Sequence, residues 1–295
     1  MYKQIAANKR KTLLLVFIFM AMIIGIGFIF STQTEYGYSA LALAIVFSGM
    51  MALFSYFTGD TLALMTSGAR EVSKEQEPRL VRIVENLCIT AGIPMPKVHI
   101  MHDKAMNAFA TGRDPKHASI AVTTGLLEAL SDVELEGVIA HELSHIRNYD
   151  IRVMTIVIIL VGIIALLSDF FLRFTFFSRS DSRESKSNAT AILFLVGIVL
   201  AILSPIIAQL IKLAVSRKRE FLADASGALL TRYPEGLASA LEKISTSNIP
   251  FAKASNATAH LFIAHPFKGS HSLLQKLFST HPPVEQRIAI LRSMI

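Results

Sequence analysis

Two histidines and a glutamate stand close together in the stretch His141-Glu142-Leu143-Ser144-His145. If this stretch is helical, its first and last residues share one face, and both imidazoles can reach a single zinc ion at about 2.0–2.1 Å. Glu142 then lies roughly 100° around the helix, where it can address a metal-bound water without binding the ion. The alternative is a helix whose three polar side chains make ordinary surface hydrogen bonds. We favour the first interpretation, because this spacing is the metalloprotease signature.

The residues before this motif predict the helix that it requires. Ser131 followed three residues later by Glu134 is typical of a capping box at a helix N-terminus. No proline follows until Pro205, which lies far beyond the motif. We therefore expect His141 and His145 to lie inside one helix.

Two histidines leave a catalytic zinc ion one protein ligand short, and the third is usually a carboxylate or another histidine. Glu220 is the candidate, because it lies in a stretch with helical character and would share a helical face with Asp224. Glu220 would then bind the metal, and Asp224 would orient an imidazole. The alternative is that both are exposed charges beside the basic cluster at 217–219. A metzincin site is excluded, since Asn148 and Ile151 stand where that motif needs glycine and histidine.

The composition is that of a membrane protein. Of the 295 residues 52% are hydrophobic, the mean hydropathy is +0.50, and only 17% are charged, against about 25% in an ordinary soluble domain. The net charge of +7 gathers in clusters beside apolar segments, which indicates membrane orientation rather than a nucleic-acid partner. Cys88 is the single cysteine, so no intrachain disulfide can form, and the polar parts suit a reducing cytoplasm.

Four apolar runs are long enough, or nearly so, to cross a bilayer as helices. They are Leu13–Phe30, Tyr38–Phe57, Val153–Ser168 and Ala189–Ile211. We interpret the first as an uncleaved anchor rather than a signal peptide, because no small-residue cleavage site follows it. Basic clusters at 9–11 and 217–219 predict that these ends face the cytoplasm. Asp169 and Pro205 weaken the last two runs, so we expect either two spans or a re-entrant hairpin.

Two polar parts of the chain are predicted to fold in water. In the first, helical periodicity covers Glu75–Thr90. Short strands are expected at Lys97–Met101 and Ser119–Thr123, with a further extended piece at Asn107–Gly112 between them. In the second, helices are predicted near 217–230, 234–246 and 283–294, with a long loop at 248–270.

Four motifs in this order resemble a known family of membrane proteases. They are His141-Glu142-Leu143-Ser144-His145, Asn107-Ala108-Phe109-Ala110-Thr111-Gly112, Glu220-Phe221-Leu222-Ala223-Asp224, and Thr280-His281-Pro282-Pro283 with Arg287. With paired apolar segments around the zinc motif, the chain is similar over nearly its whole length to the HtpX family. These are bacterial membrane zinc metalloproteases related to the CAAX prenyl endopeptidases.

The resemblance implies a mainly α, polytopic membrane protein with a gluzincin-like zinc metalloprotease domain, built of helices and a small β-sheet. That domain would lie on the cytoplasmic side of the inner membrane. One zinc ion per chain would be held by His141, His145 and Glu220, with Glu142 as the general base. The substrates would be membrane proteins or peptides, cleaved in membrane-protein quality control and the stress response.

By the same resemblance, Asn107 faces the substrate, while His281 and Arg287 help to hold the tetrahedral intermediate. Taken singly, Asn107 could instead cap a turn and His281 could start a helix. The resemblance alone therefore supports these three roles.

We divide the chain into an N-terminal transmembrane hairpin at 1–57, a first protease part at 58–150, a second transmembrane or re-entrant hairpin at 151–211, and a second protease part at 212–295. Two other functions remain as alternatives, an inactive zinc-binding adaptor and a metal-binding membrane transporter. A transporter needs ionisable residues inside its apolar runs, which here are nearly free of them apart from Asp169. An adaptor implies loss of the base or of a ligand, and none is lost.

Overall fold

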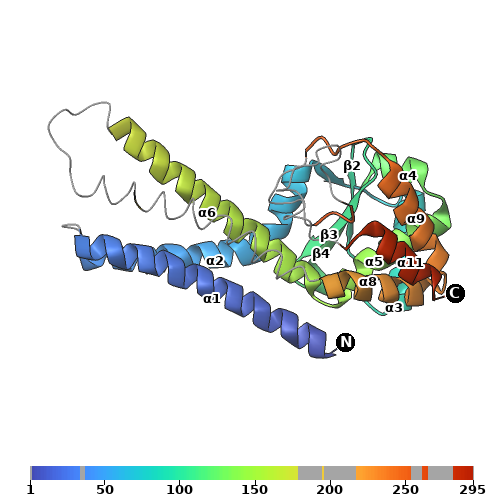
Figure 1. The fold of residues 1–295 in the computed structure, drawn as a ribbon, viewed down its shortest axis with the longest axis horizontal. Coiled ribbons are helices and arrows are strands. Elements are labelled where there is room, and N and C mark those ends of the chain that lie inside the picture. The colour runs from blue at the N-terminus through green and yellow to red at the C-terminus, as the bar shows by residue number, and fades with distance from the viewer. Residues whose placement is uncertain are drawn as a thin grey trace.

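Three long helices form an extended bundle beside a compact lobe in the computed structural model, which describes residues 2–33, 37–178, 195, 217–253, 261–264 and 282–294 (Figure 1). The bundle helices are α1 (Tyr2–Gln33), α2 (Tyr38–Ser67) and α6 (Asp150–Ser178). Each contains a stretch long and apolar enough to cross a membrane, at Gln4–Ile29, Tyr38–Ser67 and Asp150–Asp169. The chain is a membrane protein, and its first three predicted spans are helical. The fourth, Ala189–Ile211, lies outside the described residues except for Leu195.

The bundle helices pack through small and aliphatic residues on their inner faces. α1 and α2 approach closely at Gly27, where an added Cβ would lie 2.2 Å from the Cβ of Ala44. α6 packs against α1, with Ile156 buried in one cluster with Phe19 and Ile23. Large apolar side chains elsewhere on α1 and α2 are exposed, as contact with lipid requires.

A four-stranded mixed sheet forms one layer of the lobe. Its strands are β1 (Ala69–Glu71), β2 (Lys97–Met101), β3 (Ala108–Gly112) and β4 (Ala118–Thr123), in the order β1-β2-β4-β3. β2 and β4 are parallel, and the outer strands β1 and β3 pair antiparallel with them. The two predicted strands are confirmed as β2 and β4, and the predicted extended piece at 107–112 forms β3. β1 has no sequence pattern of its own. Among the described residues, β3 is an edge strand.

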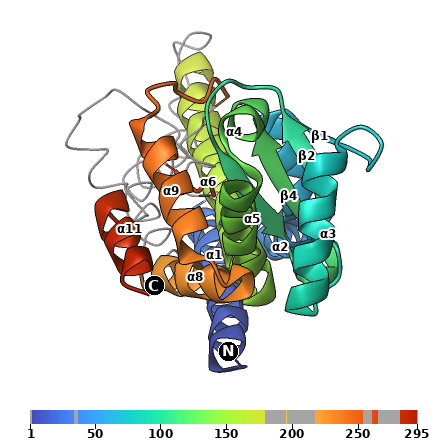
Figure 2. The same ribbon diagram turned by 90° about the vertical axis from the view of Figure 1, so that its right-hand side faces the viewer.

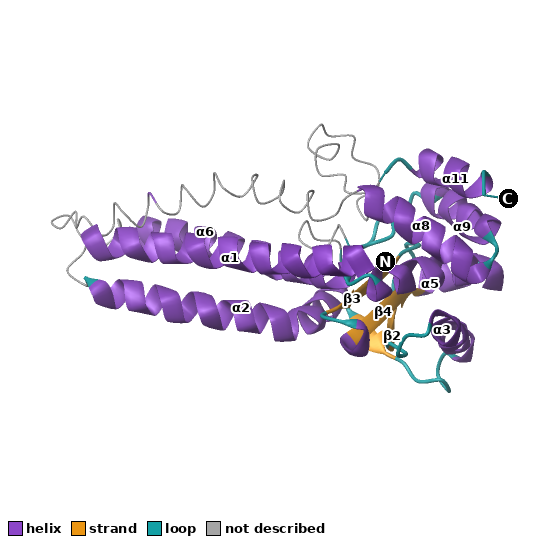
Figure 3. Cartoon of the chain, turned by 90° about the horizontal axis from the view of Figure 1, so that it is seen from below, coloured by secondary structure: helices purple, strands orange, loops and turns teal. Residues whose placement is uncertain are grey.

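Helices cover the sheet and surround α5 (Asp132–Arg147), which carries the two motif histidines. The other lobe helices are α3 (Pro78–Ala91), α4 (Thr124–Ala129), α8 (Arg217–Thr231), α9 (Pro234–Thr246) and α11 (Val284–Arg292), with a 3-10 helix at Pro115–His117. α3 lies on one side of α5, and α8, α9 and α11 lie on the other (Figure 2). The strands lie where the bundle joins the lobe (Figure 3). The predicted helices of both polar parts are therefore confirmed.

α5 is fixed at its first turn and along one side. The predicted capping box is present, and the Glu134 carboxylate accepts from the backbone N–H of Ser131 at 2.8 Å. The same carboxylate accepts from Ser239 Oγ at 2.6 Å and Lys243 Nζ at 2.8 Å, both on α9. Gly137 lets α9 approach, because a Cβ there would lie 2.6 Å from the α9 backbone. These contacts hold the motif helix in the centre of the lobe.

Candidate metal centre and active site

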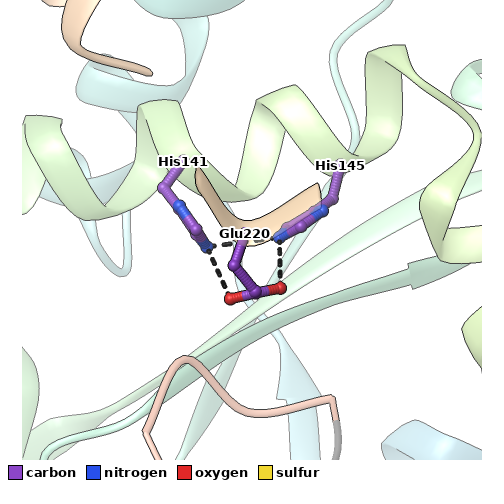
Figure 4. A group of neighbouring side chains, drawn as sticks. All are labelled: His141, His145 and Glu220. Atoms are coloured by element: carbon purple, nitrogen blue, oxygen red, sulfur yellow. Dashed lines mark hydrogen bonds and ion pairs between the residues drawn. The ribbon is translucent and has the colours of Figure 1, made fainter. Parts of the chain in front are cut away.

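His141 and His145 lie one turn apart on α5, and their rings converge on the same space (Figure 4). Their Nε2 atoms are 3.2 Å apart. Both side chains lie deep in the lobe, with only 1% and 5% of their surface exposed. The helix predicted from the motif thus brings two imidazole nitrogens to one buried point.

Glu220 comes from the first turn of α8 and completes the cluster (Figure 4). One carboxylate oxygen lies 3.8 Å from His141 Nε2, and the other lies 3.5 Å from His145 Nε2. The three ligand atoms all lie within 4.8 Å of one another, which is close enough to hold one metal ion. Gly227 permits this close approach of α8, because a Cβ there would lie 3.0 Å from the backbone nitrogen of His141.

A carboxylate contacts the outer nitrogen of each imidazole. His141 Nδ1 lies 2.9 Å from Asp224 Oδ1, and His145 Nδ1 lies 3.1 Å from Asp150 Oδ2. A hydrogen on Nδ1 then leaves the Nε2 lone pair directed at the metal position. Asp224 follows Glu220 by one turn of α8, whereas Asp150 begins α6 and the sequence reasoning missed it. The available signal was its position at the boundary between the motif helix and an apolar run.

Arg287 of α11 joins the cluster from the side of Asp224. Its Nη2 and Nε donate to the two Asp224 oxygens at 2.7 and 2.8 Å, and Nη1 lies 3.8 Å from Glu220 Oε2. The side chain is 1% exposed. The fold therefore brings this predicted residue to the ligands, while His281 lies outside the described residues.

Burial changes the acidity of Glu142, which lies between the two histidines in sequence. Its side chain is 2% exposed, and burial raises its pKa to about 7. The backbone N–H of Ala110 in β3 hydrogen-bonds to this side chain. A carboxylate with a pKa near neutrality can both accept a proton and give it back, which is what a general base in hydrolysis must do.

The electrostatics of the cluster favour a cation between the ligands. Burial opposes the charged form of His145, but its hydrogen bond with Asp150 and the charge of Glu220 raise its pKa to about 9. Burial lowers the pKa of His141, whose ring also faces the positive charge of Arg287. A bound divalent metal ion would take the place of the proton that this environment favours on His145, and the donor set would then be two neutral imidazoles and one carboxylate.

The outer edge of β3 faces this cluster. The Asn107 backbone carbonyl bonds to β4, so in an antiparallel ladder Ala108 and Ala110 direct their backbone groups away from β4. Ala108 O accepts from Ile263 N at 2.9 Å. The Asn107 side chain bonds Ala264 twice, donating from Nδ2 to its carbonyl at 3.0 Å and accepting from its N–H at 3.4 Å. Asn107 thus lies at the start of the edge, tied to the segment 261–264.

Comparison with known proteins gives several relatives. The model of peptidase family M48 matches residues 74–295. A "Protease HtpX homolog" of Dictyoglomus thermophilum is 46% identical over 99% of this chain and 94% of its own length. The homolog of Tropheryma whipplei is 51% identical over 82% of this chain and 81% of its own length. That of Ligilactobacillus salivarius is 42% identical, and the match covers 100% of both chains.

Among solved structures, that of Ste24p from S. mikatae has the same fold, with a TM-score of 0.50 and 17% identity. The similarity covers 99% of this chain and 67% of Ste24p. The segment matched by the family model contains both motif histidines, Glu142 and Glu220. Because this match and the end-to-end relatives agree with the geometry of the cluster, the chain belongs to peptidase family M48 and is a membrane metalloprotease of the HtpX type.

Proposed function

We propose that the chain is an endopeptidase with one zinc ion, held by His141, His145 and Glu220. The buried cluster with Glu142 beside it carries the proposal. Tetrahedral ligands at about 2.0–2.1 Å from zinc lie roughly 3.3 Å from one another. The two Nε2 atoms are 3.2 Å apart, and each lies 3.5 or 3.8 Å from a different one of the two Glu220 oxygens, which are separations close to that value. Three such ligands with a fourth position left for water or substrate are typical of catalytic zinc.

The side chains around the cluster have the properties that peptide hydrolysis needs. Bound zinc supplies Lewis acidity, which makes water nucleophilic near neutral pH and polarises a carbonyl. Glu142 takes the proton of the attacking water and returns it to the leaving amine, a role that its pKa of about 7 suits. Arg287 and His281 are proposed to stabilise the oxyanion, Arg287 from its buried position next to Glu220.

An extended substrate is proposed to pair with the outer edge of β3. Ile263 already bonds the Ala108 carbonyl and Glu142 accepts from the Ala110 N–H, so the substrate is proposed to pair with this edge through the Ala110 carbonyl. Phe262 is fully buried, and its ring centroid lies 5.2 Å from that of Phe109, which makes the segment 261–264 a fixed wall at one end of the edge. Backbone pairing reads shape rather than side chains, and it therefore gives weak sequence specificity.

The lobe is proposed to face the cytoplasm, with the bundle in the inner membrane. The basic clusters at 9–11 and 217–219 lie near the lobe, which agrees with the positive-inside rule. In this arrangement 1–57 and 151–211 are the membrane hairpins, and 58–150 and 212–295 together form the protease. The site would then meet membrane proteins at the inner surface, which suits membrane-protein quality control and the stress response.

Glu142→Gln tests the proposed base. In the purified full chain we expect loss of hydrolysis of a model membrane protein, with about one zinc per chain retained, because the base is not a ligand. Elemental analysis gives the zinc content. The matched control is Glu136→Gln, which removes a partly exposed carboxylate from the same helix and should change neither quantity.

Two outcomes would contradict the assignment. Turnover at the parent rate would exclude Glu142 as the base, and loss of zinc from a folded Glu142→Gln chain would make that residue a ligand. If the parent chain itself shows no hydrolysis that a zinc chelator abolishes, the adaptor function replaces the protease.

A further inference from the structure

Asp150 connects the metal cluster to the first membrane helix. Its Oδ2 contacts His145 Nδ1 at 3.1 Å, and its Oδ1 lies 3.3 Å from Arg219 Nη1 on α8. A third donor comes from α1, where Asn8 Nδ2 bonds the same Oδ1 at 2.7 Å. The Asp150 carboxylate is only 2% exposed and is contacted by side chains of three elements, α5, α8 and α1.

Asn8 also holds the end of the motif helix. Its Nδ2 donates at 2.8 Å to the backbone carbonyl of Asn148, the residue that caps the C-terminus of α5. Asn8 is 3% exposed, so its amide is shielded from water that could replace these bonds. A single side chain of α1 therefore fixes both the end of α5 and the carboxylate that contacts His145.

α1 also contacts Tyr149, which forms the turn between α5 and α6. Tyr149 has a φ of 61°, a left-handed conformation that residues other than glycine rarely adopt. This conformation turns the chain so that Asp150 lies next to His145. The Tyr149 ring lies between two cations. Lys9 Nζ of α1 is 5.0 Å from the ring centroid, and the guanidinium of Arg152 on α6 is 4.9 Å from the same centroid. Two successive residues of α1, Asn8 and Lys9, therefore contact the turn.

We propose that Asn8 is a positioning residue for the metal site, acting on His145 through Asp150. The amide saturates Oδ1 and fixes the carboxylate plane, so that Oδ2 keeps the imidazole in the orientation that presents Nε2 to the metal. Without this donor, Oδ1 loses its shorter contact and keeps only Arg219 Nη1 at 3.3 Å, so the plane of the carboxylate is less firmly fixed. The first membrane helix is then a working part of the metal site as well as an anchor.

This role of Asn8 rests on the proposed zinc site. Measuring the zinc affinity of the full chain in detergent tests both the site and the role of Asn8. Competition with a calibrated chelator gives the zinc dissociation constant of the parent and of each variant. Asn8→Ala should weaken zinc binding about 10-fold, the lower end of the range for groups behind a ligand. Asn8→Asp should weaken it further, because it places a second carboxylate against Asp150. Asn8→Ser provides a milder variant if the others fail to fold.

Thr12→Val is the matched control. Thr12 lies one turn further along the same face of α1 and is 6% exposed, and its hydroxyl makes no hydrogen bond among the described residues. The substitution keeps the shape of the side chain, so zinc affinity should equal that of the parent. A reduced affinity in this control would mean that any disturbance of α1 has the same effect, and it would overturn a specific role for Asn8.

A double-mutant cycle separates positioning from general stabilisation. If Asn8 acts through Asp150, the effects of Asn8→Ala and Asp150→Ala on zinc affinity will not add. Additive effects, or a loss of thermal stability in the metal-free chain with unchanged zinc affinity, would overturn the inference. A parent chain that binds no zinc would overturn both this inference and the proposed function, whereas parent-like binding by Asn8→Ala would overturn the inference alone.

Discussion

At the scale of single residues, each histidine of the cluster is backed by a carboxylate and each carboxylate by an arginine. Asp224 is bonded to Arg287, and Asp150 lies beside Arg219. The arginines offset the cost of burying two carboxylates, since an unpaired buried charge is strongly unfavourable. They also limit how far the carboxylates can move, and the imidazole rings with them. The protein's own contacts thus hold the ligands in place, which reduces the ordering that metal binding requires.

Glu220→Ala should weaken zinc binding more strongly than Asp224→Asn. The first change removes a ligand, whereas the second leaves all three ligands and removes only a charge that orients His141. Groups behind a ligand typically contribute about 10–100-fold to metal affinity. Chelator competition measures both dissociation constants. If Glu220→Ala bound zinc like the parent, the third ligand would be another residue, with Asp224 and His281 the next candidates.

At the scale of elements, the start of α5 is stabilised by the charge of Glu134. Burial alone would raise the pKa of this carboxylate, but hydrogen bonds from Lys243, Ser239 and Ser131 lower it to about 2. A lowered acid pKa means that the charged form stabilises the fold at pH values above the ordinary value of 4.5. This stabilisation is lost as the pH falls from there through about 2.

Glu134→Gln should therefore lower the free energy of unfolding at neutral pH by about 1–2 kcal/mol, the usual size for a lost cap with charged hydrogen bonds. The difference from the parent should shrink as the pH falls from 4.5 toward 2. Thermal unfolding in detergent across this range measures it, with Glu136→Gln as the control on the same helix. An equal loss at every pH would show that Glu134 acts through packing and not through charge.

Elements with a local signal were predictable from the sequence. α5 carries its capping box and its histidine spacing within a single helix, so no distant residue is needed to recognise it. α3 and α9 likewise show a clear apolar face. β1 and α4 have only three and six residues, too few for a periodic pattern to develop.

Contacts between distant segments could not be predicted, because the fold creates them. Arg287 meets Asp224 across 63 positions of sequence, and Asn8 meets Asp150 across 142. Family resemblance pointed to Arg287, but neither pattern nor resemblance marked Asn8 or Asp150. The role of His281 stays a prediction, since that residue lies outside the described part of the chain.

At the scale of the whole molecule, all three bundle helices meet the lobe at the same end. α2 leads directly into β1, α6 leaves the lobe at Asp150, and α1 touches that residue through Asn8 near its N-terminus. Figure 1 shows the other ends of the helices far from the lobe. The N-terminus therefore lies on the side of the metal site, which agrees with a bundle that crosses the membrane from that side.

The shared site limits how the chain can cross the bilayer. Because His145 and Glu220 belong to one cluster, residues 146–219 must cross an even number of times. α6 is a candidate span, so a chain that crosses there must return before α8, and Ala189–Ile211 is the predicted return. Two spans would export the basic residues of the link between them, against the positive-inside rule. Arg173 pairs with Asp169 at 2.7 Å, which offsets part of that charge, and we favour two spans.

Single introduced cysteines can decide between two spans and a re-entrant hairpin. Cys88→Ala supplies the background, and the native thiol is itself 3% exposed with a pKa that burial raises to about 11. Ser73→Cys and Asn248→Cys place thiols on exposed parts of the lobe, one before and one after the two predicted spans at 153–168 and 189–211. Ser182→Cys places a thiol in the link between these spans. Permeabilised cells provide the control, in which all three thiols should react with a maleimide.

In intact spheroplasts, a membrane-impermeant maleimide should label Ser182→Cys and spare the two lobe positions. This result follows from two spans, because an even number of crossings returns the chain to the cytoplasm while the link is outside. Protection of all three positions would instead mean that the segment re-enters without crossing. Labelling of Ser73→Cys but not Asn248→Cys would put the two halves of the lobe on opposite sides of the membrane. His145 and Glu220 could then not bind one metal ion, and the protease assignment would fail with them.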